Sequence, residues 1–118
     1  MGFGGCFVDK SLIDGEFTNL FVKPLIDDSA RMKGIIRYLR GIDWQLVDGL
    51  ATEHARIASE VLFIWGVDDP TFPIDRAQPM LTQLKRASLV PIEGAKLLPH
   101  EEKPADVAKH ALAFFAAT

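Results

Sequence analysis

The sequence predicts an α/β fold in which a helical first half, residues 1–58, precedes a β-α-β-α second half, residues 59–118, with a parallel strand pair. In the first half, apolar residues recur every three or four positions, which is the period of an amphipathic helix. The second half holds two short, almost wholly apolar runs, each followed by a segment of helical period. Short apolar runs that alternate with helices are typical of parallel strands buried on both faces.

Three helices are expected in the first half. The first spans residues 16–26, and Pro24 should bend or end it because proline has no backbone N–H to donate. Ser29 is the expected N-cap of the second helix, Gly41 ends that helix, and Asp43 caps the third. Their apolar stripes are Phe17, Leu20, Phe21 and Leu25, then Met32, Ile35, Ile36 and Leu39, then Val47, Leu50 and Ile57. Helices this short need a surface beneath them to bury their stripes.

In the second half, residues 61–65 form the first expected strand and residues 75–84 the helix that follows it. Residues 88–92 form the second strand, and Pro91 places it at a sheet edge because it lacks one backbone donor. Pro104 suits the first turn of the last helix. The residues expected to face inward are Ala77, Met80, Leu81 and Leu84 on the first of these helices, and Ala108, Ala111, Leu112 and Phe115 on the second.

The composition is that of one ordinary globular domain. Of its 118 residues, 48% are hydrophobic and 25% are charged. The formal net charge of −3 disfavours nucleic acid and anionic membranes as partners, because both repel a negative protein. The sequence holds neither 18 consecutive apolar residues nor a basic, apolar leader, so no membrane-spanning helix and no secretory signal are expected.

Cysteine and histidine usage argues against a metal site. Cys6 is the single cysteine, so no internal disulfide can form and a reducing, cytoplasmic location is expected. The three histidines, His54, His100 and His110, do not cluster at the spacing of metal ligands. No glycine-rich phosphate loop follows a strand. We therefore expect neither a metal nor a cofactor.

Residues 62–73, LFIWGVDDPTFP, carry an apolar strand, then Gly-x-x-Asp, then a proline. This block resembles the strand and loop that hold the acid of the triad in α/β-hydrolases, most closely the haloalkane dehalogenases, epoxide hydrolases and related esterases. The resemblance implies that Asp69 is the acid, which orients the catalytic histidine and stabilises its charged form. The alternative is that Asp69 is only a turn residue before Pro70. By its position, the helical first half corresponds to the lid of that family.

Residues 92–104, IEGAKLLPHEEKP, resemble the last strand and the histidine loop of the same family. The histidine of the family pattern Gly-Ala-Gly-His falls at Leu97, and Lys96 replaces the small residue before it. Leucine cannot accept a proton, so the general-base position is vacant. His100 follows three residues later, either as a base brought in by a shifted loop or, as we favour, as a polar residue beside the helix. The candidate catalytic residues are thus Asp69 and His100.

The nucleophile of the family is missing. No Gly-x-Ser-x-Gly elbow occurs in the sequence. The run Asp43-Trp44-Gln45 resembles the Asp-Trp-Gly nucleophile of dehalogenases, but glutamine stands where the elbow needs glycine and no apolar strand precedes Asp43. The strands that come before the lid in the family are also absent. The chain is therefore interpreted as the C-terminal part of an α/β-hydrolase, a lid segment with the last two β-α units.

The expected function is that of a hydrolase of ester, epoxide or haloalkane type, inactive alone and with a small apolar substrate. The alternatives are a non-catalytic oligomerisation or binding module and a complementing half of a split hydrolase. A strand edge without a neighbour and lid helices without a floor both invite association. The expected partner is a second copy of the chain or a missing N-terminal half of a hydrolase.

Overall fold

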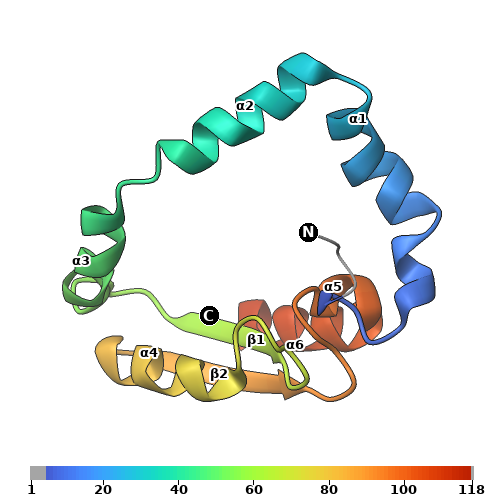
Figure 1. Cartoon of the computed structure of the whole chain (residues 1–118). Coiled ribbons are helices and arrows are strands. Elements are labelled where there is room, and N and C mark those ends of the chain that lie inside the picture. The colour runs from blue at the N-terminus through green and yellow to red at the C-terminus, as the bar shows by residue number, and fades with distance from the viewer. Residues whose placement is uncertain (1–4, 118) are drawn as a thin grey trace.

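The structure is a computed structural model and describes residues 5–117. Its elements are η2 (Lys10–Ile13), η3 (Thr18–Val22), α1 (Lys23–Ile26), α2 (Ser29–Arg40), α3 (Trp44–His54), β1 (Val61–Gly66), η4 (Ile74–Arg76), α4 (Ala77–Gln83), β2 (Ala87–Ile92), α5 (Pro99–Glu102) and α6 (Pro104–Ala117). β1 and β2 pair in parallel, with Val61 opposite Ala87 and Gly66 opposite Ile92. The predicted α/β fold, helices followed by β-α-β-α, is confirmed (Figure 1).

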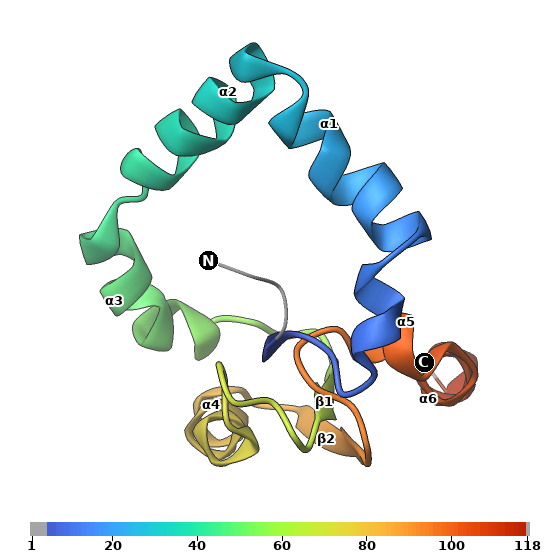
Figure 2. The same cartoon turned by 45° about the vertical axis from the view of Figure 1, so that its right-hand side comes forward.

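The N-terminal helices form an arch that stands away from the strand pair (Figures 1 and 2). η3 and α1 make one limb, α2 spans the arch, and α3 returns to α4, where His54 Nδ1 lies 2.8 Å from Gln83 Oε1. The radius of gyration is 16.7 Å. A compact domain of this length has a radius of gyration of about 13.5 Å. The arch helices therefore leave much of their surface uncovered.

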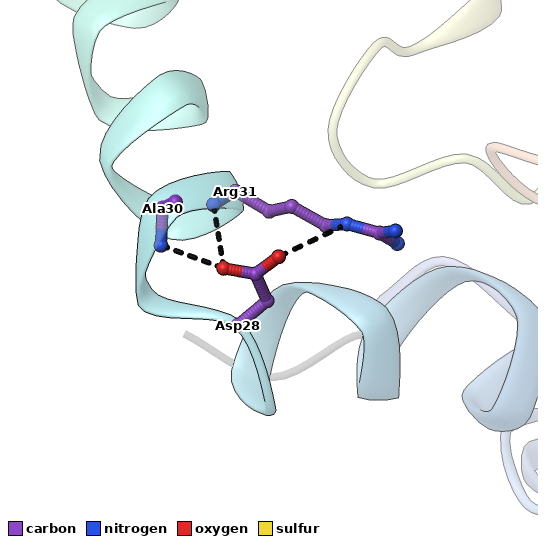
Figure 3. A network of polar contacts seen from close by, with 3 residues as sticks. All are labelled: Asp28, Ala30 and Arg31. Carbon is purple, nitrogen blue, oxygen red and sulfur yellow. Dashed lines mark hydrogen bonds and ion pairs between the residues drawn. The ribbon is translucent and has the colours of Figure 1, made fainter.

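The N-cap of α2 is an aspartate, Asp28, one residue before the expected Ser29. Asp28 Oδ1 accepts hydrogen bonds from the backbone N–H groups of Ala30, at 2.8 Å, and Arg31, at 3.4 Å (Figure 3). The prediction that Ser29 is the N-cap is wrong, because the Asp28 carboxylate already satisfies two N–H groups of the first turn and Ser29 is the first helical residue.

The other boundaries of the arch helices follow the sequence more closely. Gly41 closes α2 and Asp43 caps α3, as predicted. The chain stays helical through Pro24 to the end of α1, and a π-helical turn, η3, directly precedes the proline's helix. α3 ends at His54, so Ile57 lies outside the helix, contrary to the prediction. The reason is that the Ile57 N–H bonds to the His54 carbonyl three residues back, which tightens the chain into a turn.

β1 is less buried than the sequence predicts. Its first five residues are partly exposed, and only Gly66 is buried. A parallel strand is normally buried by a strand on each side and by helices on both faces. Within residues 5–117, β1 has a strand only on the β2 side, with α6 and α5 packed against it. Among the described residues, β1 therefore lacks the neighbouring strand that its predicted burial requires.

The two crossover helices differ in how well their buried faces were predicted. The inward stripe of α4 is confirmed, because Ala77 and Leu84 are buried and Met80 and Leu81 are half-buried. The stripe of α6 is wrong at three of its four positions, since Leu112 and Phe115 are 70% and 72% exposed and Ala108 is exposed too. The partly buried positions are Val107, His110, Ala111 and Phe114. α6 rests on a strand pair that covers only one side of it, and periodicity alone does not tell which side that is.

The segment before the arch is held against the C-terminal half. Phe7 is fully buried, and its ring meets that of Phe17 edge to face with the centroids 5.0 Å apart. Asp9 caps η2, and hydrogen bonds from the Ser11 hydroxyl and N–H lower the pKa of the Asp9 carboxyl. The Val8 N–H donates a hydrogen bond to the Glu102 carboxylate, which ties the segment around Phe7 to the C-terminal half.

Candidate active site

Asp69 lies in the loop that leaves the C-terminal end of β1. Its side chain is buried, and its Oδ1 accepts hydrogen bonds from the backbone N–H groups of Thr71, at 2.8 Å, and Phe72, at 3.1 Å. This Asx turn fixes the direction of the carboxylate. Within residues 5–117 no hydrogen-bond donor reaches its Oδ2 atom. One carboxylate oxygen thus builds the loop, and the other is available to a further donor.

An aromatic side chain closes the same loop. The indole Nε1 of Trp65, the fifth residue of β1, donates a hydrogen bond of 2.8 Å to the carbonyl oxygen of Phe72. Together with the two bonds to Asp69, this contact ties the start of the loop to its middle. The loop that carries Asp69 is therefore anchored to β1 through Trp65.

The loop that follows β2 lies directly against the end of β1. The N–H of Asp68 donates a 3.0 Å hydrogen bond to the carbonyl of Ala95. A Cβ atom at Gly66 would lie 2.0 Å from the carbonyl oxygen of Lys96 and 2.5 Å from that of Ala95. Only glycine lets two backbones approach this closely. The glycine of the Gly-x-x-Asp pattern therefore serves the contact between the two loops.

A partly open pocket of about 240 Å³ lies where the two loops meet. Asp69 and Leu97 both line it, together with Trp65, Phe72 and Lys96. The candidate acid and the residue at the histidine position of the resemblance thus line the same pocket. The isobutyl group of Leu97 has neither a proton donor nor an acceptor. The pocket can hold a small apolar group, but Leu97 offers the carboxylate no base to orient.

His100 is not brought to this pocket. It lies on the short helix α5 with its side chain 58% exposed, and its Nε2 is 3.9 Å from Glu101 Oε1. His54 bridges α3 and α4, and His110 lies half-buried on α6. Of the two candidate residues, only Asp69 therefore lies in the pocket between the loops.

Glu102, at the end of α5, is a site residue that the sequence did not reveal. Its Oε2 accepts a 2.6 Å hydrogen bond from the N–H of Lys96, and its Oε1 accepts a 2.5 Å bond from the N–H of Val8. One carboxylate thus joins the loop that carries Leu97 to the segment around the buried Phe7. Its position just before the last helix predicts no contact with a residue 94 positions away.

The described residues hold no metal-ligand cluster. Across residues 5–117, no three side chains of histidine, cysteine, aspartate or glutamate lie close enough together to hold an ion. The helices found in that same range are all too short or too polar to cross a bilayer. The site is therefore characterised by its carboxylate, its pocket and the two loops that frame it.

Comparison with known proteins gives one informative match. No protein-family model matches the chain, and no curated protein does. Among solved structures, a bacterial membrane phospholipase A, described as a novel virulence factor, is 31% identical to this chain with a TM-score of 0.55. The match covers 58% of this chain and 22% of that one, so the matched part of this chain corresponds to about a fifth of the phospholipase. This chain, whose helices are followed by two parallel strands that alternate with helices, is thus similar over part of its length to a lipolytic hydrolase.

Proposed function

We propose that this chain forms the C-terminal part of an α/β-hydrolase whose substrate class is the esters, and that it has no turnover alone. The similarity to a phospholipase A supports an ester over an epoxide or a haloalkane, because the name of that enzyme denotes a lipid-ester hydrolase. The share of that enzyme which the match covers supports a part rather than a whole catalytic unit.

The observation that carries the proposal is the meeting of Asp69 and Leu97 in one pocket. In a triad, the acid must lie beside the base, because it orients the imidazole and stabilises its charged form. At Gly66 the backbones of the two loops approach closely, as the placement of an acid beside a base requires. With leucine at position 97, the pocket keeps the Asp69 carboxylate but has no imidazole beside it. The histidine step of the triad, in which the imidazole takes the proton of the nucleophile, therefore has no residue at position 97 to perform it.

Restoring the base tests this reading of the pocket. In the variant Leu97→His, we expect the introduced imidazole to titrate at a higher pKa than in Leu97→His combined with Asp69→Asn. An adjacent carboxylate favours the charged imidazole, whereas the neutral amide does not. Histidine ring signals followed by NMR across a pH series give both pKa values, with His54, His100 and His110 as internal references.

The double variant is a matched control, because an asparagine oxygen can still accept the two loop N–H groups that bind Asp69 Oδ1. Equal pKa values in the two backgrounds would show that the introduced side chain does not meet Asp69. The assignment of Leu97 to the base position would then fail.

An assembly module is a second candidate, favoured by the exposed area. The chain exposes 8577 Å². A compact monomer of 13.1 kDa exposes about 6,400 Å². Large apolar side chains account for part of the difference, because Leu112, Phe115 and Ile26 are 70%, 72% and 67% exposed. The far edge of β1 also has no strand beside it among the described residues. Such surfaces are stabilised by association, with a second copy or with the rest of a hydrolase.

We expect the purified chain to self-associate in solution. Light scattering across a dilution series should give a mass above 13.1 kDa at micromolar concentration that falls on dilution. The physical reason is that the chain exposes more surface than a compact monomer of its mass, and that large apolar side chains form part of this surface. A monomer that melts cooperatively over the whole series would contradict the assembly hypothesis.

A further inference from the structure

The helix α2 differs from the rest of the chain in charge. All four of its charged residues are basic, namely Arg31, Lys33, Arg37 and Arg40. The whole chain has 13 basic and 16 acidic residues. Helix α2 holds four of the basic residues and none of the acidic ones. The helix therefore carries a formal charge of +4 and the remainder of the chain −7. Positive charge is concentrated on one element of an otherwise acidic protein.

The same helix is strongly amphipathic. With about 3.6 residues per turn, its apolar side chains Met32, Ile35, Ile36 and Leu39 form one stripe. Arg40 and Lys33 flank the stripe on one side and Arg31 flanks it on the other, whereas Arg37 lies on the opposite face of the helix. Ile35 and Ile36 are each 40% exposed and Leu39 is 55% exposed. The stripe therefore lies open, with cations along both of its borders.

The place of α2 in the fold leaves these side chains accessible. It spans the part of the arch that lies farthest from the strand pair (Figures 1 and 2). Arg31 Nε lies 3.3 Å from Asp28 Oδ2, in an exposed ion pair at the start of the helix (Figure 3). Lys33, Arg37 and Arg40 have no ion-pair partner within the described part of the chain. Three cations are thus uncommitted, on a helix whose first turn Asp28 caps.

We propose that α2 binds an anionic lipid surface, lying flat with its apolar stripe at the acyl boundary and its flanking cations at the lipid phosphates. A basic amphipathic helix of low overall hydrophobicity is the type that lies in a membrane interface rather than crossing it. The absence of acidic residues from α2 favours a uniformly negative plane over a protein groove of mixed charge. The net charge of −3 predicts no membrane partner, but that sum averages over a helix of opposite sign. This proposal is independent of the hydrolase function.

Vesicle co-sedimentation of the whole chain tests it. Binding should occur with vesicles in which phosphatidylglycerol replaces part of the phosphatidylcholine, and not with phosphatidylcholine alone. The variant Lys33→Gln with Arg40→Gln should bind about 30-fold more weakly, from roughly five-fold per cation near an anionic surface. Raised salt should weaken binding as well, because it screens exposed charges.

A matched control removes the same net charge elsewhere. Lys85→Gln with Lys109→Gln changes two exposed lysines outside α2 and should leave binding unchanged. Far-UV circular dichroism of all three proteins verifies that the helices are retained. A second variant, Ile36→Ser, should also weaken binding, because it interrupts the stripe without changing charge.

Three outcomes would overturn the proposal. They are equal binding to neutral and anionic vesicles, an equal loss in the Lys85 and Lys109 control, and no binding to either vesicle. Self-association that disappears in the Lys33 and Arg40 variant, together with absent vesicle binding, would instead identify a second copy of the chain as the occupant of α2.

Discussion

Replacement of Gly66 by alanine is expected to destabilise the C-terminal half by about 3 kcal/mol or more, at the upper end of overpacking effects. The added methyl group would lie 2.0 Å from the carbonyl oxygen of Lys96 and 2.5 Å from that of Ala95. Both are backbone atoms, so no rotamer change relieves the clash, and the two loops of the pocket must separate. Urea unfolding followed by tryptophan fluorescence measures the loss, since Trp65 lies in β1.

Gly49→Ala is the matched control for this substitution. No atom lies within 4 Å of a Cβ atom at Gly49, on helix α3. Alanine there should stabilise the helix by up to about 1 kcal/mol, because glycine is a poor helix former. If Gly66→Ala unfolded at the same urea concentration as the unchanged chain, the close approach of the two loops would be wrong. The argument from the pocket would fail with it.

Glu102→Ala should cost about 2 kcal/mol, the second largest effect expected. Hydrogen bonds to a charged group contribute about 1.5–3 kcal/mol each when they are shielded from water. The bond to the Lys96 N–H is partly buried and contributes most, whereas water can replace Glu102 at the exposed Val8 N–H. The variant should also release the N-terminal segment, so hydrogen exchange at the amides of Phe7 and Val8 should accelerate.

The neighbouring residue provides the comparison. Glu101→Ala removes the same group from the same short helix, but its carboxylate contacts only His100, at 3.9 Å, among the described ion pairs. That change should cost less than about 0.5 kcal/mol, as surface substitutions usually do. Glu102→Gln, which keeps one acceptor oxygen, should fall between the two. Equal stability of the Glu101 and Glu102 variants would refute the role of Glu102 in joining the loop to the N-terminal segment.

Local signals in the sequence predicted the order of the elements. The apolar run that ends at Gly66, the cap at Asp43 and the stop at Gly41 all lie where they were expected. These features depend on hydrogen bonds and steric limits within a few residues, so a single stretch of sequence contains the information. The inward stripe of α4 was also correct, because one side of that helix is clearly more apolar than the other.

Two of the errors concern burial, which depends on the elements that pack against a helix or a strand. The stripe expected on α6 lies exposed at Leu112 and Phe115, because the sequence does not tell which side of a largely apolar helix rests on the strands. β1 is half-exposed for the same reason, since its burial requires flanking strands that the described residues do not supply. Ser29 and Asp28 are both good caps, and the choice between adjacent candidates follows from backbone geometry.

By itself, the sequence determined the chemistry available to the site: a carboxylate at the end of a strand, and a leucine at the position where the resemblance to the α/β-hydrolases places a histidine. Side-chain identity alone decides which groups can transfer a proton, so no fold is needed for that conclusion. Only the tertiary structure decided that Asp69 and Leu97 share a pocket, that Glu102 holds the loop beside it, and that α2 stands exposed. Those facts depend on contacts between residues far apart in the chain, which neither periodicity nor net charge records.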